Sequence, residues 1–147
     1  VLGAGGVGRA IVAALAHYGA EVVIYNRTVT RAEKLAEEFN SRAAPLTDAP
    51  TAEAEILINC TSIGMHPNVN DCPLETLPPG VKVVFDTVYN PLRTRLLRLA
   101  EAGGIATVTG LEMFLNQAVA QFETWTSKKA PRDVMREVVV KKLTGTE

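Results

Sequence analysis

Three glycines near the start of the chain have the spacing of a loop that holds the diphosphate of a dinucleotide. Gly3, Gly5 and Gly8 form a G-x-G-x-x-G pattern between the apolar pair Val1–Leu2 and a helical pattern. The first glycine permits a sharp turn, the second lets the backbone approach a pyrophosphate, and the third lets the helix pack closely against the sheet. The N–H groups at the start of that helix then face the diphosphate. The predicted nucleotide-binding loop is Gly3, Ala4, Gly5, Gly6, Val7 and Gly8.

The end of the next predicted strand indicates which dinucleotide this loop takes. At this point, about twenty residues farther along, an NAD site carries a carboxylate that bonds the ribose 2′-hydroxyl and would repel a 2′-phosphate. This chain reads Asn26–Arg27–Thr28 instead, with Arg31 four residues after Arg27. Guanidinium groups present planar forks of donors that suit a phosphate. These four residues therefore predict a site for NADP and for hydride-transfer chemistry, the alternative being a solvated arginine pair near a helix start.

Alternating strand and helix patterns are expected to hold these residues at one edge of a sheet. Apolar and β-branched runs predict strands ending at Val1–Leu2 and spanning residues 21–25, 43–46, 55–59, 81–85 and 105–108. Apolar residues at helical spacing, with local start and stop signals, predict helices over residues 9–17, 31–39, 92–102, 111–126 and 131–143. This order predicts an α/β, doubly wound (Rossmann), mostly parallel six-stranded sheet with helices on both faces.

Two further local signals refine this plan. Thr30 and Glu33 match a capping box, which is expected to begin the second helix at Arg31. Residues 61–79 contain many Pro, Asn and Gly residues and are expected to form a long irregular loop. Loops of this length in a compact domain are often functional.

The composition, net charge and cysteine spacing of the chain argue against nucleic-acid-binding, membrane-spanning and metal-binding proteins. The chain has 147 residues, 47% hydrophobic and 21% charged, which is ordinary for one soluble globular domain. Its net charge of −1 argues against nucleic acid as a partner, and no apolar run approaches the roughly 20 residues of a membrane span. Cys60 and Cys72 lack the spacing of metal or redox motifs, so we expect reduced thiols, no metal site and a cytoplasmic location. Because the chain starts with Val within a strand-like segment, we expect it to be part of a longer protein.

Five blocks, taken in order, resemble the NADP-binding domain of the shikimate dehydrogenase family. They are residues 3–6 (GAGG), 26–28 (NRT, with Arg31), 59–65 (NCTSIGM), 86–91 (DTVYNP) and 110–118 (GLEMFLNQA). The blocks are spread in order from residue 3 to residue 118, so the resemblance is more specific than any one motif. The loop at residues 65–68 also resembles the dehydrogenase half of fused dehydratase–dehydrogenase enzymes.

The resemblance implies a role for several residues that carry no clear signal of their own. It implies that Tyr89 and Gln117 contact the substrate, shikimate or 3-dehydroshikimate, and that Gly110 offers its backbone to the carboxamide of the cofactor. Without the resemblance, Tyr89 would be interpreted as a packed core residue and Gln117 as a solvated helix residue. The hydroxyls of Thr61 and Ser62 would be interpreted as turn-forming groups bonded to the backbone. Asp86, at a strand end, either handles a proton or orients the loop that follows. The residues placed on the nicotinamide side are Thr61, Ser62, Thr87 and Met113.

The proton donor that ketone reduction requires is not evident in this sequence. In the family, a Lys–Asp pair on an N-terminal substrate domain supplies it. The lysines here do not stand at strand ends facing the predicted site; they are Lys34, Lys82, Lys128, Lys129, Lys141 and Lys142. We therefore expect residues 1–147 to form one cofactor-binding domain, with no catalytic residue of its own and with that substrate domain as its partner. The alternatives are a quinate/shikimate dehydrogenase, a glutamyl-tRNA reductase-like domain and an NADP-sensing module without turnover.

Overall fold

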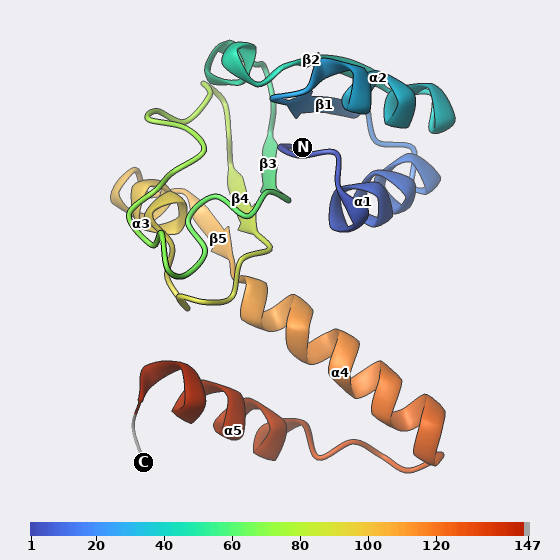
Figure 1. Cartoon of the computed structure of the whole chain (residues 1–147), viewed down its shortest axis with the longest axis vertical. Coiled ribbons are helices and arrows are strands. Elements are labelled where there is room, and N and C mark those ends of the chain that lie inside the picture. The colour runs from blue at the N-terminus through green and yellow to red at the C-terminus, as the bar shows by residue number, and fades with distance from the viewer. Residues whose placement is uncertain (146–147) are drawn as a thin grey trace.

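The structure is a computed structural model that describes residues 1–145. Strands and helices alternate along the chain, as the sequence predicts (Figure 1). The strands are β1 (Val23–Asn26), β2 (Arg42–Pro45), β3 (Ile56–Asn59), β4 (Val83–Asp86) and β5 (Ala106–Val108). The helices are α1 (Gly6–His17), α2 (Val29–Glu38), α3 (Arg95–Ala102), α4 (Gly110–Thr126) and α5 (Arg132–Thr144), with a 3₁₀ helix η1 (Leu46–Thr51).

Leu2 occupies the centre of the sheet without belonging to a regular strand. The pair β1–β2 and the set β3–β4–β5 are each parallel, and Leu2 forms parallel bridges to Tyr25 of β1 and to Asn59 of β3. The Leu2 N–H donates to the carbonyl of Ile58 at 2.8 Å, and the Cys60 N–H donates to the carbonyl of Leu2 at 2.8 Å. The lateral order is therefore β2, β1, Leu2, β3, β4, β5. The described residues contain five strands rather than the six predicted, because the first is reduced to a bridge.

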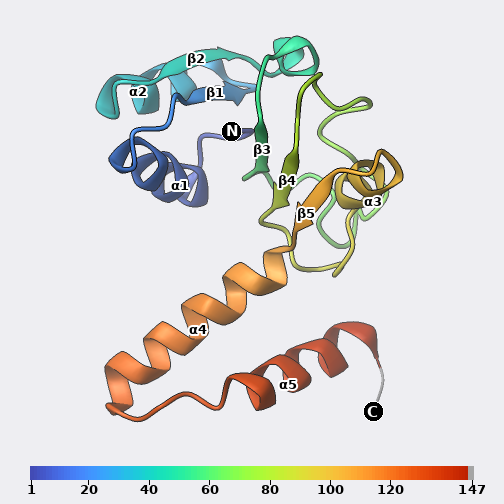
Figure 2. The same cartoon turned by 180° about the vertical axis from the view of Figure 1, so that it is seen from behind.

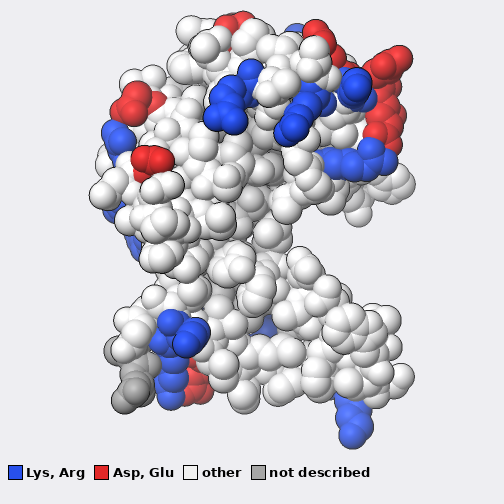
Figure 3. Space-filling model, in the orientation of Figure 1, with Lys and Arg blue, Asp and Glu red and all other residues white. Residues whose placement is uncertain are grey.

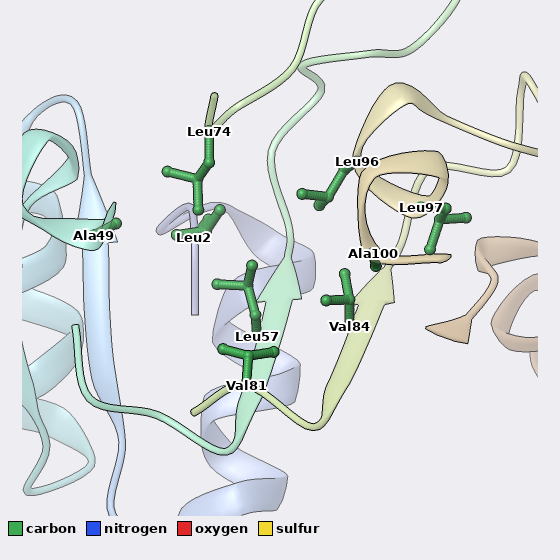
Figure 4. Close-up of a cluster of buried hydrophobic side chains, with 9 residues drawn as sticks. All are labelled: Leu2, Ala49, Leu57, Leu74, Val81, Val84, Leu96, Leu97 and Ala100. Atoms are coloured by element: carbon green, nitrogen blue, oxygen red, sulfur yellow. The ribbon is translucent and has the colours of Figure 1, made fainter. Parts of the chain in front are cut away.

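Two buried clusters show that helices cover both faces of the sheet. Successive residues of a strand point to opposite faces, and Ile24 and Tyr25 pack into different clusters. The cluster shared by α1, α2 and β1 contains Val12, Val22, Ile24, Ala32, Leu35 and Ala36. The cluster of Figure 4 joins the central strands to α3, η1 and the long loop, and contains Leu2, Ala49, Leu57, Leu74, Val81, Val84, Leu96, Leu97 and Ala100.

Helix α2 begins two residues earlier than the capping box predicts. Its N-cap is Thr28, in extended conformation with φ −98° and ψ 95°, and no side chain caps the helix. Thr30 therefore lies inside the first turn, and Arg31 is the third helical residue rather than the first. The reason lies at the end of β1, where the Asn26 side-chain amide donates to the carbonyl of Thr28 at 2.8 Å. This contact turns the chain at once, before the predicted cap is reached.

The last two helices extend away from the sheet. Figures 1 and 2 show α4 leading away from the end of β5 and α5 returning beside it, and Figure 3 shows a waist between this pair and the rest of the molecule. Glu112 of α4 forms ion pairs with both Arg132 and Arg136 of α5. Helix α5 buries no residue. Among residues 1–145, no helix is long and apolar enough to cross a membrane.

Candidate functional site

The carboxyl edge of the sheet collects most of the predicted site residues. Gly3 follows the central Leu2, Asn26 ends β1, Asn59 ends β3 and Asp86 ends β4. All these segments run in parallel, so these positions meet at the same edge. The strand order also reverses here, because the chain first builds outward to β2 and then returns to β3 on the other side of Leu2. Open α/β sheets bind their ligands at such a switch point.

Two glycines of the loop are required by the packing of the loop itself. Gly3 has φ +99°, in the region that favours glycine, and a Cβ there would come within 3.0 Å of the Thr61 methyl carbon. A Cβ on Gly8 would overlap the carbonyl oxygen of Gly3, closer than real side chains approach. Gly8 therefore lets α1 lie directly against the turn that precedes it, as the dinucleotide pattern requires.

The other two glycines of the loop face open space. A Cβ on Gly5 or on Gly6 would meet no atom within 4 Å. Gly5 is the N-cap of α1; no side chain caps this end, and its first turn holds no acidic residue. The first N–H groups of a helix have no partner within the helix, and the helix dipole favours an anion there. The N-terminus of α1 is thus open and suited to a phosphate group.

Asn26 connects the glycine loop to the arginines. Its Oδ1 accepts a hydrogen bond from the Ala4 N–H at 3.3 Å, while its Nδ2 donates to Thr28. Arg27, Thr28 and Arg31 are exposed beside it. Within the described part of the chain, neither guanidinium group of these two arginines makes a hydrogen bond or an ion pair. Both are therefore available to an anionic ligand, unlike Arg9, which is paired with Glu38.

The turns after β3 and β4 carry the residues expected on the nicotinamide side. Thr61 is half-buried and Ser62 is exposed. Thr87 is 8% exposed, and its N–H donates to the carbonyl of Asn59 at 3.0 Å. A Cβ on Gly110 would come within 2.5 Å of the carbonyl oxygen of Thr87. The start of α4 thus packs on the turn after β4, and only glycine fits at this contact.

Phe114 connects the two predicted substrate residues, Tyr89 and Gln117, because it contacts the first and lies in the same helix as the second. The Tyr89 ring, 37% exposed, stacks on the Phe114 ring with centroids 4.7 Å apart and an interplanar angle of 28°. Gln117 is exposed and follows Phe114 by three residues in α4, so the two lie on the same side of the helix. Met113 is half-buried in the first turn of that helix. The structure therefore brings Tyr89 and Gln117 to one region beside the carboxyl edge.

A buried polar network lies beneath these turns; the sequence pointed to Asp86, as a residue that either handles a proton or orients the following loop, but not to its buried partners. Asn59, Asp86 and Thr94 are at most 1% exposed. The Asp86 carboxylate accepts hydrogen bonds from Asn59 Nδ2 at 3.0 Å, the Val88 N–H at 3.0 Å and Thr94 Oγ1 at 2.6 Å. Burial raises the pKa of Asp86, and these hydrogen bonds act against that rise. The signal in the sequence was a polar residue at the end of each of two neighbouring apolar strands.

Among residues 1–145, the charged and sulfur-containing side chains outside this site suggest no second catalytic or metal-binding site. Lys82 precedes β4 at the opposite edge of the sheet and pairs with Glu55 at 2.5 Å. Cys60 and Cys72 are free thiols, and burial raises the pKa of Cys60 to about 12. In residues 1–145, no group of three His, Cys, Asp or Glu side chains is placed to hold a metal ion. A cavity of about 800 Å³ opens at the amino edge, beside Val1 and Ile56, away from the residues described above.

Known proteins resemble this chain over nearly its whole length. It is 44% identical over 145 residues to the bifunctional 3-dehydroquinate dehydratase/shikimate dehydrogenase of Arabidopsis thaliana, covering 96% of this chain and 24% of that protein. Shikimate 5-dehydrogenase of Thermus thermophilus, solved with NADP(H) and shikimate, is 43% identical with a TM-score of 0.82, covering 92% of this chain and 51% of that one. Quinate dehydrogenase of Corynebacterium glutamicum, solved with NAD, is 30% identical with a TM-score of 0.85, covering 95% and 53%.

The chain thus spans about half the length of these single-function relatives and a quarter of the bifunctional one. Residues 1–79 match the family model described as shikimate/quinate 5-dehydrogenase. Residues 110–140 match the model described as the shikimate 5′-dehydrogenase C-terminal domain. The first match alone covers more than half of the chain, and it includes the glycine loop and the Asn26–Arg27–Thr28 turn. The chain belongs to the shikimate/quinate 5-dehydrogenase family.

Proposed function

We propose that this chain is the NADP-binding domain of a shikimate dehydrogenase, which reversibly reduces 3-dehydroshikimate to shikimate with NADPH. The observation that carries the proposal is the pair of guanidinium groups of Arg27 and Arg31, which have no partner among residues 1–145 and lie beside Asn26, the residue that bonds the glycine loop. Relatives solved with NADP(H) and with NAD both exist. The preference for NADP therefore rests on the residues of this chain.

The open end of α1 suits the diphosphate, which would approach the backbone at Gly5 and Gly6. Arg27, Thr28 and Arg31 are proposed to hold the 2′-phosphate. The half of the site that would take the nicotinamide comprises Thr61, Ser62, Thr87, Gly110 and Met113.

When bound, NADPH would supply the hydride that reduces the carbonyl carbon of the substrate. The residues of this chain bind and orient: Tyr89, held by its stacking on Phe114, and Gln117 would contact the substrate hydroxyls. The carbonyl oxygen must also receive a proton. No lysine of the described residues lies at the carboxyl edge, so we assign the proton donor to a substrate domain outside this chain.

Helices α4 and α5 are the proposed docking surface for that domain. Val134 and Val138 lie one helical turn apart in α5 and are 58% and 62% exposed, and Trp125 near the end of α4 is 77% exposed. Exposed apolar residues that share one helix face mark an interaction surface. The occupant we propose is the N-terminal domain of the same protein, because the relatives are about twice as long as this chain.

We also propose that the sheet of the whole protein has six strands in a doubly wound (Rossmann) arrangement. Leu2 already bridges β1 and β3, and the cavity at the amino edge lies between the first residues of these two strands. Residues upstream of Val1 would fill it as the central strand. The free thiols fit a reducing compartment, and we propose the cytoplasm.

Titration of the chain with NADP and with NAD tests the cofactor assignment. A charge-assisted hydrogen bond contributes about 1.5–3 kcal/mol, and the exposure of Arg27 reduces this value. We expect Arg27→Ala to weaken NADP binding by about tenfold or more and to change NAD binding less than twofold. Arg42→Ala is the matched control, because Arg42 is exposed and begins β2 at the opposite edge. Equal losses for both cofactors would refute the proposed phosphate site.

Quinate is the second candidate substrate, since the matching family model covers both dehydrogenases and a quinate dehydrogenase has a TM-score of 0.85. The ratio of kcat/KM for shikimate and quinate, measured on the whole protein, distinguishes the two. Turnover of neither substrate, with NADP binding intact, would indicate a module that senses NADP.

A further inference from the structure

The carboxyl edge of the sheet contains three buried polar side chains that do not face the proposed cofactor site directly. Asn59 and Asp86 are register partners in β3 and β4. They follow Leu57 and Val84 by two residues, so they point to the same face as the cluster in Figure 4, the face that α3 covers. Thr94 is the N-cap of α3. We call the side chains of Asn59 and Asp86 the clasp; Thr94 connects the clasp to α3.

Asp86 joins three segments of the chain through its carboxylate. One oxygen accepts from Asn59 Nδ2 and from the Val88 N–H, each at 3.0 Å. The other accepts from Thr94 Oγ1 at 2.6 Å, and Thr94 Oγ1 itself accepts from the Leu97 N–H at 3.3 Å. The carboxylate thus holds β3, the turn after β4 and the first turn of α3 to one point.

Asn59 performs the same task for the turn after β3. Its Oδ1 accepts from the Thr61 N–H at 3.0 Å and from Thr61 Oγ1 at 2.7 Å. Thr61 Oγ1 then accepts from the Ile63 N–H at 3.2 Å, which closes the turn. The backbone carbonyl of Asn59 also accepts from the Thr87 N–H at 3.0 Å. Both turns of the nicotinamide side are therefore anchored to the same pair of side chains.

We propose that the clasp positions the two turns, residues 61–63 and 87–88, against the nicotinamide ring, so that Asp86 is a positioning residue for hydride transfer. This inference rests on the proposed function. Asp86 acts through Asn59 and Val88, and its contacts extend to Gly110, which packs on the carbonyls of Thr87 and Val88. The adenosine half of the site has separate anchors, in Asn26 and the glycine loop.

Two variants in the whole enzyme distinguish positioning from general stability. Asp86→Asn keeps the shape but replaces charge-assisted hydrogen bonds to Asn59 and Val88 with weaker neutral ones. Thr94→Val is the matched control, because it loses the Thr94–Asp86 contact but leaves the carboxylate bonded to Asn59 and to the Val88 N–H. A misplacement of about 1 Å in a reacting group costs up to about 100-fold in rate.

We expect Asp86→Asn to lower kcat by about tenfold or more, with the KM for NADPH changed by less than about threefold. Its deuterium isotope effect on kcat, with NADPH deuterated at the transferred position, should rise because hydride transfer becomes slower. Thr94→Val should lower the melting temperature and keep kcat within about twofold. Equal kcat losses in both variants, or an unchanged kcat in Asp86→Asn, would overturn the proposal.

Hydrogen exchange of the wild-type enzyme provides a test that does not depend on either variant folding. The N–H groups of Thr61 and Val88 lie in turns, yet the clasp should protect them as strongly as the ends of β3 and β4. Exchange as fast as at the exposed Asn68 and Asn70 would refute the clasp. If the wild-type enzyme binds NADP but turns over neither shikimate nor quinate, the proposed function fails, whereas the exchange result still decides whether the clasp holds the turns.

Discussion

Gly5 and Gly8 are three residues apart, yet replacement of each by alanine is expected to have different consequences. A Cβ on Gly8 would overlap the carbonyl oxygen of Gly3 and lie 3.2 Å from its carbonyl carbon. These atoms belong to backbone and cannot rotate away, so α1 must move. A Cβ on Gly5 meets no protein atom within 4 Å, and its φ of −91° and ψ of −171° suit alanine.

The expected magnitudes follow from these contacts. Overpacking of this kind costs about 1–3 kcal/mol, which corresponds to a fall of about 2–12 °C in the melting temperature of a domain this size. Gly5→Ala changes only the preference at the N-cap, which costs less than about 1 kcal/mol. Its methyl group, however, would occupy the space that we propose for the diphosphate. We expect at least about a tenfold loss of NADP affinity, from the steric exclusion of a close backbone–phosphate contact.

Thermal unfolding and fluorescence titration with NADPH, applied to both variants, measure the two effects separately. Gly103→Ala is the control, because Gly103 ends α3 away from the glycine loop and its Cβ would have no contact closer than 3.4 Å. We expect Gly5→Ala to lose affinity with nearly native stability, and Gly8→Ala to lose both. Native NADPH affinity in Gly5→Ala, or native stability in Gly8→Ala, would refute this account of the loop.

Two further predictions concern the turn after β4 and the buried thiol. Gly110→Ala should lower the melting temperature, because its Cβ would lie 2.5 Å from the carbonyl oxygens of Thr87 and Val88, and calorimetry showing an unchanged transition would contradict this packing. Burial raises the pKa of Cys60 from 9.0 to about 12, so about a thousandfold less thiolate forms at any pH below 9. Native Cys60 should therefore react with a disulfide reagent far more slowly than after denaturation, and more quickly as pH rises. Equal rates in the two states would show that the thiol is not buried.

The local patterns of the sequence determined which segments become strands and helices, and which edge carries the glycine loop. Every regular helix and strand of the structure overlaps a predicted one, because apolar periodicity reflects which side of each segment is buried. The turn Asn26–Arg27–Thr28 could also be predicted from the sequence, because its three residues are consecutive and follow the end of a single strand. Local signals were wrong about the start of α2, where Asn26 turns the chain before the Thr30 cap, and they missed η1.

Only the tertiary structure decided which distant residues act together. Asn59, Asp86 and Thr94 are separated by 27 and 8 residues, and no local pattern relates them. The register of β3 with β4 places the first two side by side, and the packing of α3 on the same face adds the third. In the same way, stacking on Phe114 brings Tyr89 to the helix that carries Gln117. A sequence determines the preferences of each segment through its near neighbours, whereas strand register and helix packing depend on contacts that form only when the whole chain has folded.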